Sequence, residues 1–290
     1  MIRDETRLGL LDELDGALER VPALEPLCET RFLETHVLYE GRSDQQRRII
    51  EWFGQNMGPA GGADRAFRVL SVGCGSGILD VPLAVRFASG APALHYVGVD
   101  PNQAECNAFV RRFESADLPD EASLTVEASP FEDFDAEGRF DLVHLVHCLY
   151  YLQDPEAVIA KARRLLAPGG SLVLVHAPRG HLNDLSTRFY DKGYGRPTWF
   201  ADDCAGMLED LGWAYDRSRI DAQVDVTPFA ERDPVVGLAL RDFIVQFDSL
   251  KLPLEVQGMV DRYLDLIAFR DAKGTVFIDH PADVFVIAES

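Results

Sequence analysis

The chain has 290 residues, 47% of them hydrophobic, and its 48 acidic against 28 basic side chains give a formal net charge of −20. This length is enough for one substantial α/β domain with additions. The surplus of acid argues against nucleic acid as a partner, because the sequence has no Lys/Arg cluster to bind phosphates and the net charge repels them.

Membrane and metal partners are also not indicated. No apolar run reaches the length of a membrane span, and the first residues lack the apolar core of a signal peptide, so we expect no membrane partner and a cytoplasmic protein. The five cysteines are scattered and lack CxxC spacing, which indicates neither a disulfide framework nor a metal site.

The first part of the chain, residues 1–62, has a helical pattern. Leucines from Leu8 to Leu18 recur at helical spacing, and Ser43 is a suitable N-cap for a helix that continues through Trp52. The glycines between residues 58 and 62 form a joint. We therefore predict a helical N-terminal segment that closes as a lid over the substrate.

Strands and helices alternate in the next part, residues 63–225. Such alternation predicts parallel strands with right-handed helical crossovers, in a doubly wound sheet. The expected strands are 67–72, 94–99, 122–127, 140–147 and 171–177, and the expected helices are 78–88, 102–115, 155–166 and one that begins at Ala201.

The last part, residues 226–290, begins with two amphipathic helical patterns within 233–269, too long for a simple connection. We expect this segment to be a helical substrate-binding insertion. Two apolar runs, 275–278 and 284–287, follow it and predict a hairpin or bent strand that completes the sheet.

The stretch with the strongest functional signal is FRVLSVGCGSG, Phe67 to Gly77. A buried strand turns here into glycines, which let the backbone bend sharply and approach a ligand closely. A second strand ends at Asp100, whose carboxylate can bind the two hydroxyls of a ribose. The dinucleotide fingerprint GxGxxG has Ile78 at its third glycine, so NAD is not indicated.

This pattern resembles the class I S-adenosylmethionine (SAM) dependent methyltransferases, which share the GxGxG strand, the acidic residue after the second strand and a turn like APGG at 167–170. The resemblance implies a Rossmann-like doubly wound sheet of seven strands, with SAM as the cofactor. The cofactor-binding residues that it implies are Gly73, Gly75, Gly77, Asp100, Pro101, Glu105, Val146, and Ser129 or Phe131 beside the adenine.

A further group of candidate residues ends the strand FDLVHLVHCLYY. His147, Tyr150 and Tyr151 lie where strand ends of a doubly wound sheet face the reacting centre, and aromatic faces there can surround a cation. His144 and His147 are three apart on a strand and point to opposite faces, so they do not predict a metal pair.

Three longer segments, LVHCLYYLQDPEAV, FADDCAGMLEDLGWAYDRSRIDAQVDVTPF and GTVFIDHPADVFVIAE, are similar in order and spacing to the histamine N-methyltransferase family. The resemblance implies a substrate carboxylate at Asp44, polar substrate contacts at His147 and His280, and aromatic walls from Tyr150, Tyr151 and Phe243. Asp44, His147 and His280 differ from the family's own residues, so the acceptor can differ from histamine.

These resemblances predict a SAM-dependent methyltransferase that acts on the nitrogen of a small or peptide-borne amine, as a monomer or weak homodimer. Methyl transfer needs a neutral nitrogen, so His147 or His280 is the expected proton acceptor, while Asp44 orients the amine. Two alternatives stay open: transfer to oxygen or carbon of a small metabolite, and a SAM-binding module without catalysis.

Overall fold

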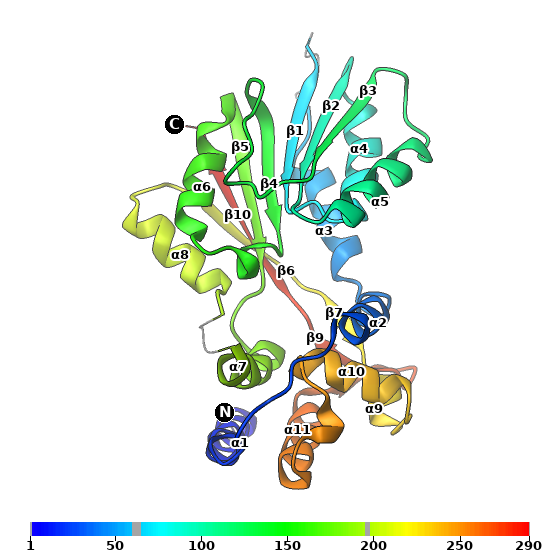
Figure 1. The fold of residues 1–290 in the computed structure, drawn as a ribbon, viewed down its shortest axis with the longest axis vertical. Coiled ribbons are helices and arrows are strands. Elements are labelled where there is room, and N and C mark those ends of the chain that lie inside the picture. The colour runs from blue at the N-terminus through cyan, green and yellow to red at the C-terminus, as the bar shows by residue number, and fades with distance from the viewer. Residues whose placement is uncertain (1, 60–64, 195–197, 290) are drawn as a thin grey trace. The chain divides into compact units, whose positions relative to one another are not determined.

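The computed structural model describes residues 2–59, 65–194 and 198–289. They form two compact units, each built from three separate stretches of chain (Figure 1). Unit 1 contains residues 1–45, 178–198 and 221–281, and unit 2 contains residues 46–177, 199–220 and 282–290.

Unit 2 contains a seven-stranded sheet in the order β3-β2-β1-β4-β5-β10-β6. The first five strands of the chain pair in parallel, and β10 is antiparallel to both β5 and β6. The strands are β1 (Phe67–Val72), β2 (Leu94–Val99), β3 (Ala122–Glu127), β4 (Phe140–Val146), β5 (Leu166–His176), β6 (Asp216–Ile220) and β10 (Ala282–Ala288).

Helices cover both faces of this sheet (Figure 1). One hydrophobic cluster joins the sheet to α3 (Gln45–Asn56), α4 (Asp80–Ala88) and α5 (Gln103–Glu114). A second cluster joins the other face to α6 (Pro155–Arg164) and α8 (Ala201–Asp210). The doubly wound, seven-stranded fold class that the sequence predicts is therefore confirmed.

Unit 1 is mostly helical and has its own hydrophobic core. A three-stranded sheet, in the order β7-β9-β8, packs among the helices. The elements are α1 (Ile2–Glu19), α2 (Glu29–Glu40), α7 (His181–Tyr194), α9 (Thr227–Ala230), α10 (Val236–Val245), α11 (Leu254–Ile267), β7 (Gln223–Asp225), β8 (Phe269–Arg270) and β9 (Val276–Asp279), with short 3₁₀ turns at Leu149–Tyr151 of unit 2 and Ser249–Lys251 of unit 1.

The strands at the end of the chain differ from the expected hairpin that completes one sheet. β9 pairs with β7 and β8 of unit 1, whereas β10 alone enters the large sheet. Pro281 lies between them, and proline has no N–H to continue a ladder. A bend at this point sends the two strands into different sheets.

The sequence predicts three continuous domains, 1–62, 63–225 and 226–290, whereas each unit of the structure is built from three separate stretches of chain. The expected joint lies partly outside the described residues, at 60–62. The stretch 178–198, which contains α7, belongs to unit 1, because Leu182, Leu185 and Phe189 are buried in its core. Residues 221–225 join the same unit through the pairing of β7 with β9.

Candidate active site

The glycine turn after β1 has three glycines at positive φ: Gly73 at 70°, Gly75 at 49° and Gly77 at 70°. A Cβ at Gly77 would lie 2.1 Å from the buried ring of Phe109, and one at Gly73 would lie 2.6 Å from Cys148 Cβ. At Gly75 the nearest heavy atom to such a Cβ is Glu105 Oε2, at 4.0 Å. Two glycines therefore allow close packing of the turn, and the middle one leaves its backbone open beside an acidic side chain.

Asp100 lies directly after β2 and connects the two loops of this region. Its Oδ2 accepts a hydrogen bond from the backbone N–H of Gly75 at 3.0 Å, and its Oδ1 accepts one from Asn102 N–H at 2.8 Å. Asn102 in turn caps α5, by accepting from the N–H groups of Ala104 and Glu105. The carboxyl ends of β1 and β2 thus present Gly75, Asp100 and Glu105 together.

This arrangement fits SAM. The open backbone at Gly75 permits close approach of a ligand, and carboxylates can bind ribose hydroxyls and an amino group. Pro101 follows Asp100 and is exposed, while Val146 ends β4, which is the neighbour of β1. Ser129 Oγ donates to Glu127 Oε1 at 2.9 Å, and the buried Phe131 stacks on Phe134. The cofactor roles of all these residues stay predictions.

His147 follows β4 with a φ of 50°, which is unusual for a residue with a side chain. Its Nδ1 lies 3.1 Å from the hydroxyl of Tyr150, and the two rings are parallel, with an interplanar angle of 2°. Tyr151 packs edge-on against Tyr150 and is 70% exposed. The structure therefore brings these three predicted residues together.

His176 belongs to the same cluster, although sequence reasoning missed it. Val146 and Val175 are register partners at the ends of β4 and β5, so His147 and His176 occupy adjacent strand ends. The ring of Tyr150 lies 4.2 Å from that of His176, centroid to centroid. The sequence feature that could have identified His176 is its position, as a lone histidine near the end of a predicted strand.

Burial keeps both histidines neutral. It lowers the pKa of His147 to about 4 and that of His176 to about 3, and it raises the pKa of Tyr150. Among the described residues, His147 Nε2 and His176 Nδ1 are buried without a hydrogen-bond partner. Such atoms are rare in native structures, and each needs an explanation such as a catalytic role or a bound water; Nδ1 of the core residue His144 is in the same state.

The other predicted substrate residues, Asp44, Phe243 and His280, lie in unit 1. Asp44 Oδ1 accepts a hydrogen bond from Gln223 N–H at 2.8 Å, and His280 Nδ1 lies 2.9 Å from Ser43 Oγ. Tyr39 packs on both Phe243 and His280, with centroid distances of 4.5 and 5.2 Å. Within this unit, aromatic packing thus joins Phe243 to His280, while Asp44 bonds to β7.

A separate polar network lies beneath the glycine turn. The Tyr96 hydroxyl donates to Asp80 Oδ1 at 2.9 Å and lies 2.9 Å from His144 Nε2, with all three residues buried. Burial raises the pKa of Asp80 to about 6 and lowers that of His144 to about 3. These groups are enclosed in the core and are structural.

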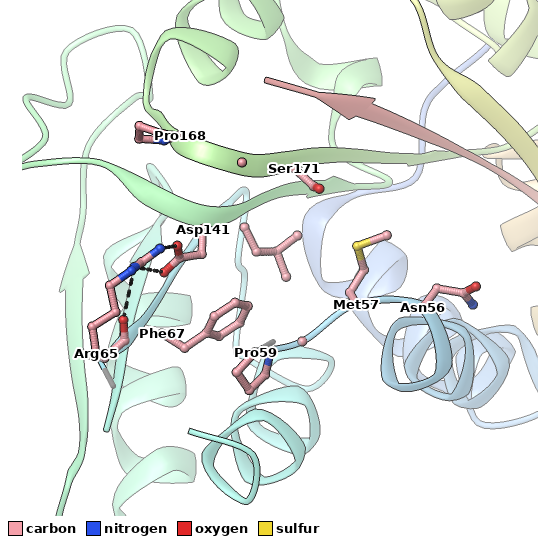
Figure 2. Close-up of a pocket in the computed structure, with 12 residues that line it drawn as sticks. Asn56, Met57, Pro59, Arg65, Phe67, Asp141, Pro168 and Ser171 are labelled. Atoms are coloured by element: carbon pink, nitrogen blue, oxygen red, sulfur yellow. Dashed lines mark hydrogen bonds and ion pairs between the residues drawn. The ribbon is translucent and has the colours of Figure 1, made fainter. Parts of the chain in front are cut away.

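Figure 2 shows a cavity of about 380 Å³ in unit 2 that lies away from this site. Its walls include Phe67, the first residue of β1, and Asp141, the second residue of β4, so it is at the amino ends of the strands. Arg65 Nη1 bonds to Asp141 Oδ2 at 2.9 Å across its rim. Because parallel α/β sheets bind ligands at the carboxyl ends of their strands, this cavity is not the candidate active site.

The described part of the chain has no cluster of three or more His, Cys, Asp or Glu side chains suited to a metal ion. No helix within it is long and apolar enough to cross a membrane.

The sheet order, the glycine turn and Asp100 define the chain as a class I methyltransferase. A family model described as "Methyltransferase domain" matches residues 41–219, and the chain belongs to this family. The prediction of a class I methyltransferase is therefore confirmed, and SAM is the cofactor that this family and site support.

Solved structures agree on the fold. The cyclopropane synthase MmaA2 of Mycobacterium tuberculosis has a TM-score of 0.51 and 14% identity, covering 84% of each chain. A geranyl diphosphate methyltransferase in complex with SAM has a TM-score of 0.50 and 16% identity, covering 83% of this chain and 84% of its own.

The similar sequences include two kinds of methyltransferase. Ubiquinone biosynthesis O-methyltransferase of Pseudomonas aeruginosa is 32% identical over 126 residues, which are 43% of this chain and 48% of that protein. The chain thus matches about half the length of this relative. Histamine N-methyltransferase of Xenopus tropicalis is 23% identical over 250 residues, covering 77% of this chain and 82% of that protein. The prediction of amine methylation is therefore not confirmed, and oxygen methylation fits the relatives of higher identity somewhat better.

Proposed function

We propose that this protein transfers a methyl group from SAM to an oxygen or nitrogen of a small molecule, with the acceptor held at the carboxyl ends of β4 and β5. The observation that carries the proposal is the buried, unpartnered His147 Nε2, in a cluster with Tyr150 and His176. It lies at the strand edge that also carries Gly75 and Asp100, on the neighbouring strands β1 and β2.

The residues of the chain supply position and environment. When bound, SAM supplies an electrophilic methyl group. Gly75, Asp100 and Glu105 would hold it, and Tyr150 would present an aromatic face to the acceptor. Holding two reactants in line lowers the barrier by several kcal/mol, about 7–11 in the best cases.

An oxygen acceptor is the first candidate. The relatives of about 32% identity are O-methyltransferases, although their match spans only 43% of this chain. A neutral imidazole can accept a hydrogen bond from a hydroxyl group, and burial keeps both His147 and His176 in that neutral form at pH 7.

A small or peptide-borne amine is the second candidate. The match to histamine N-methyltransferase covers more of the chain than the family match does. On this proposal Asp44, Phe243 and His280 of unit 1 stay predicted amine contacts, and His147 of unit 2 stays the predicted proton acceptor. A carbon acceptor, or a module that binds SAM without turnover, would replace both candidates if neither hydroxyls nor amines react.

The test is mass spectrometry of purified protein with SAM and a panel of hydroxyl compounds, amines and amine-bearing peptides. We expect S-adenosylhomocysteine to accumulate together with a product that is one methyl group heavier. Binding of SAM without S-adenosylhomocysteine across the panel would contradict the enzymatic proposal. Light scattering of the same preparation tests the proposed monomer or weak homodimer.

A further inference from the structure

We infer that Lys161, on α6, is a positioning residue for the cofactor, because its ammonium group holds the loop after β3 in the shape that receives the adenine of SAM. This loop consists of residues 128–139, and all of it belongs to unit 2. The inference rests on SAM as the cofactor and on the predicted place of the adenine beside Ser129 or Phe131. It adds to the proposed function a residue that acts through the loop.

The loop is irregular where a helix is usual. Parallel strands are generally joined through a helical crossover, yet residues 128–139, all of which the structure describes, contain no helix between β3 and β4. Instead the rings of Phe131 and Phe134 stack, 6.0 Å apart between centroids, and are buried in the hydrophobic cluster that α6 and α8 form with the sheet. A helix pairs its carbonyl groups internally, whereas this loop needs donors from elsewhere.

Lys161 supplies these donors. Its Nζ donates to the backbone oxygens of Phe131 at 2.7 Å, Glu132 at 2.9 Å and Phe134 at 2.6 Å. An ammonium group has three N–H donors, so all three are used on one turn of the loop. The same nitrogen lies 5.0 Å from the centroid of the Phe131 ring, within the range of a cation–π contact. One side chain therefore fixes both the backbone of the turn and the ring that it carries.

The loop begins at the edge of the sheet that carries Asp100. The backbone N–H of Asp100 donates to the oxygen of Glu127, the last residue of β3, at 3.2 Å. Phe131 belongs to the same hydrophobic cluster as Val72 and Val99, the last residues of β1 and β2. The loop therefore lies at the carboxyl ends of the strands, as the candidate active site does.

This position indicates which end of SAM the loop meets. The ribose of SAM joins the adenine to the methionine part, so the two extend from opposite sides of the sugar. In the sheet, β2 lies between β1, which carries the glycine turn, and β3, which carries the loop. With the ribose at Asp100 and the methionine part at Gly75, we expect the adenine to extend toward the loop.

Without the ammonium group of Lys161, three backbone oxygens would lose their shared donor. They would turn to water, and the loop would hold the receiving shape for only part of the time. Affinity falls in proportion to the fraction of protein in the binding-competent shape, so SAM should bind more weakly. The effect should concern the adenine, since the hydrogen bonds of Asp100 with Gly75 and Asn102 do not involve Lys161.

The first test measures binding of S-adenosylhomocysteine by calorimetry, which needs no acceptor and no turnover. Lys161→Met keeps nearly the same length without the donors, and we expect it to raise Kd by about 10-fold, as for a loop in the binding shape about one tenth of the time. Lys161→Arg keeps the charge but presents a planar fork, so it should recover part of the affinity. Arg164→Met, at an exposed position of the same helix, controls for lost charge and should bind like the wild type.

S-Ribosylhomocysteine, which is S-adenosylhomocysteine without the adenine, separates a role at the adenine from damage to the whole site. NMR titration measures its affinity, and Lys161→Met should leave that affinity unchanged. An equal loss of affinity for both ligands would overturn the inference. An unchanged Kd for S-adenosylhomocysteine together with a lower melting temperature would also overturn it, because Lys161 would then support the fold alone.

Hydrogen exchange of the ligand-free protein tests the loop itself. The N–H of Asp133 donates to the oxygen of Pro130 at 3.0 Å, and the N–H of Phe134 to that of Phe131 at 3.2 Å. We expect both to exchange several-fold faster in Lys161→Met, and equal exchange in the two proteins would contradict the inference. Failure of the wild type to bind S-adenosylhomocysteine would instead contradict SAM as the cofactor, and with it both the proposed function and the role of the loop at the adenine.

Discussion

The carboxylate of Asp100 accepts a hydrogen bond from the backbone N–H of Gly75 at 3.0 Å, so one side chain joins the end of β2 to the glycine turn after β1. Its other oxygen bonds to Asn102 N–H, at the start of α5. The residue proposed to bind the ribose therefore also sets the shape of the loops that surround it.

We predict that Asp100→Ala weakens SAM binding by about 1.5–3 kcal/mol, the range for losing hydrogen bonds to a charged group. Both the ribose contact and the loop geometry would be lost. Isothermal calorimetry measures the change directly. Asp120→Ala, at an exposed turn of unit 2, is the control and should bind SAM like the wild type. Equal affinity of the Asp100 variant would contradict the cofactor role of this residue.

We predict that Gly77→Ala destabilises unit 2 by about 2–5 kcal/mol, because a positive φ disfavours a side chain and the new methyl group overlaps Phe109. Gly206→Ala is the matched control, since nothing lies within 4 Å of a Cβ there, in the middle of α8. It should stabilise the protein by about 0.5–1 kcal/mol. Urea unfolding of both variants checks the prediction, and a Gly77 variant as stable as the wild type would show that the turn can relax.

The sequence predicts the large sheet well because its signals are local. Strands 67–72, 94–99 and 122–127 have the predicted bounds, since each is a short run bounded by turn residues. The glycine turn and Asp100 are equally local, as spacing within one βαβ unit places them at the same edge.

The small strand β7 and the role of His176 could not be predicted, because both depend on contacts between segments that are distant in the sequence. β7 has only three residues and exists because it pairs with β9, more than fifty residues later. The place of His176 in the candidate site depends on its contacts with the Tyr150 ring, 4.2 Å away from centroid to centroid, and with the carbonyl of Trp199. No pattern near these residues in the sequence predicts these contacts, because their partners are distant along the chain.

We predict that Asp44→Ala destabilises unit 1 by about 1–3 kcal/mol, whatever its role in substrate binding, because Gln223 N–H loses its acceptor. Asp44→Asn keeps an oxygen at this position and should cost less. If Asp44 also binds an amine, both variants raise KM for that amine, since neither side chain is charged. Thermal unfolding combined with KM separates the two roles, and an unchanged melting temperature for the alanine variant would refute the structural one.

The last prediction concerns how the stability of the folded protein changes at acidic pH. Three of the seven histidines lie in the interior of unit 2: His144 and His176 are buried and His147 is half-buried, and desolvation lowers their pKa values from 6.5 to about 3, 3 and 4 in that order. Below pH 6.5 the unfolded chain therefore binds protons that the folded chain does not, and stability falls as the pH falls. The pKa of Asp80, raised to about 6 from 3.8 by burial, acts in the opposite direction between these two values.

On unfolding near pH 5, the three histidines take up about three protons and Asp80 releases about one, so the net uptake is about two protons. The free energy of unfolding should therefore fall by about 2–3 kcal/mol for each unit by which the pH is lowered there. Urea titrations between pH 4.5 and 7.5 measure this slope. Removing one buried histidine with His176→Phe should reduce the slope by about one proton, whereas Asp80→Asn should increase it, because the opposing group is gone. A free energy of unfolding that does not change between pH 7 and 5 would mean that these histidines become protonated in the folded protein. The proposal that they are neutral would then be wrong.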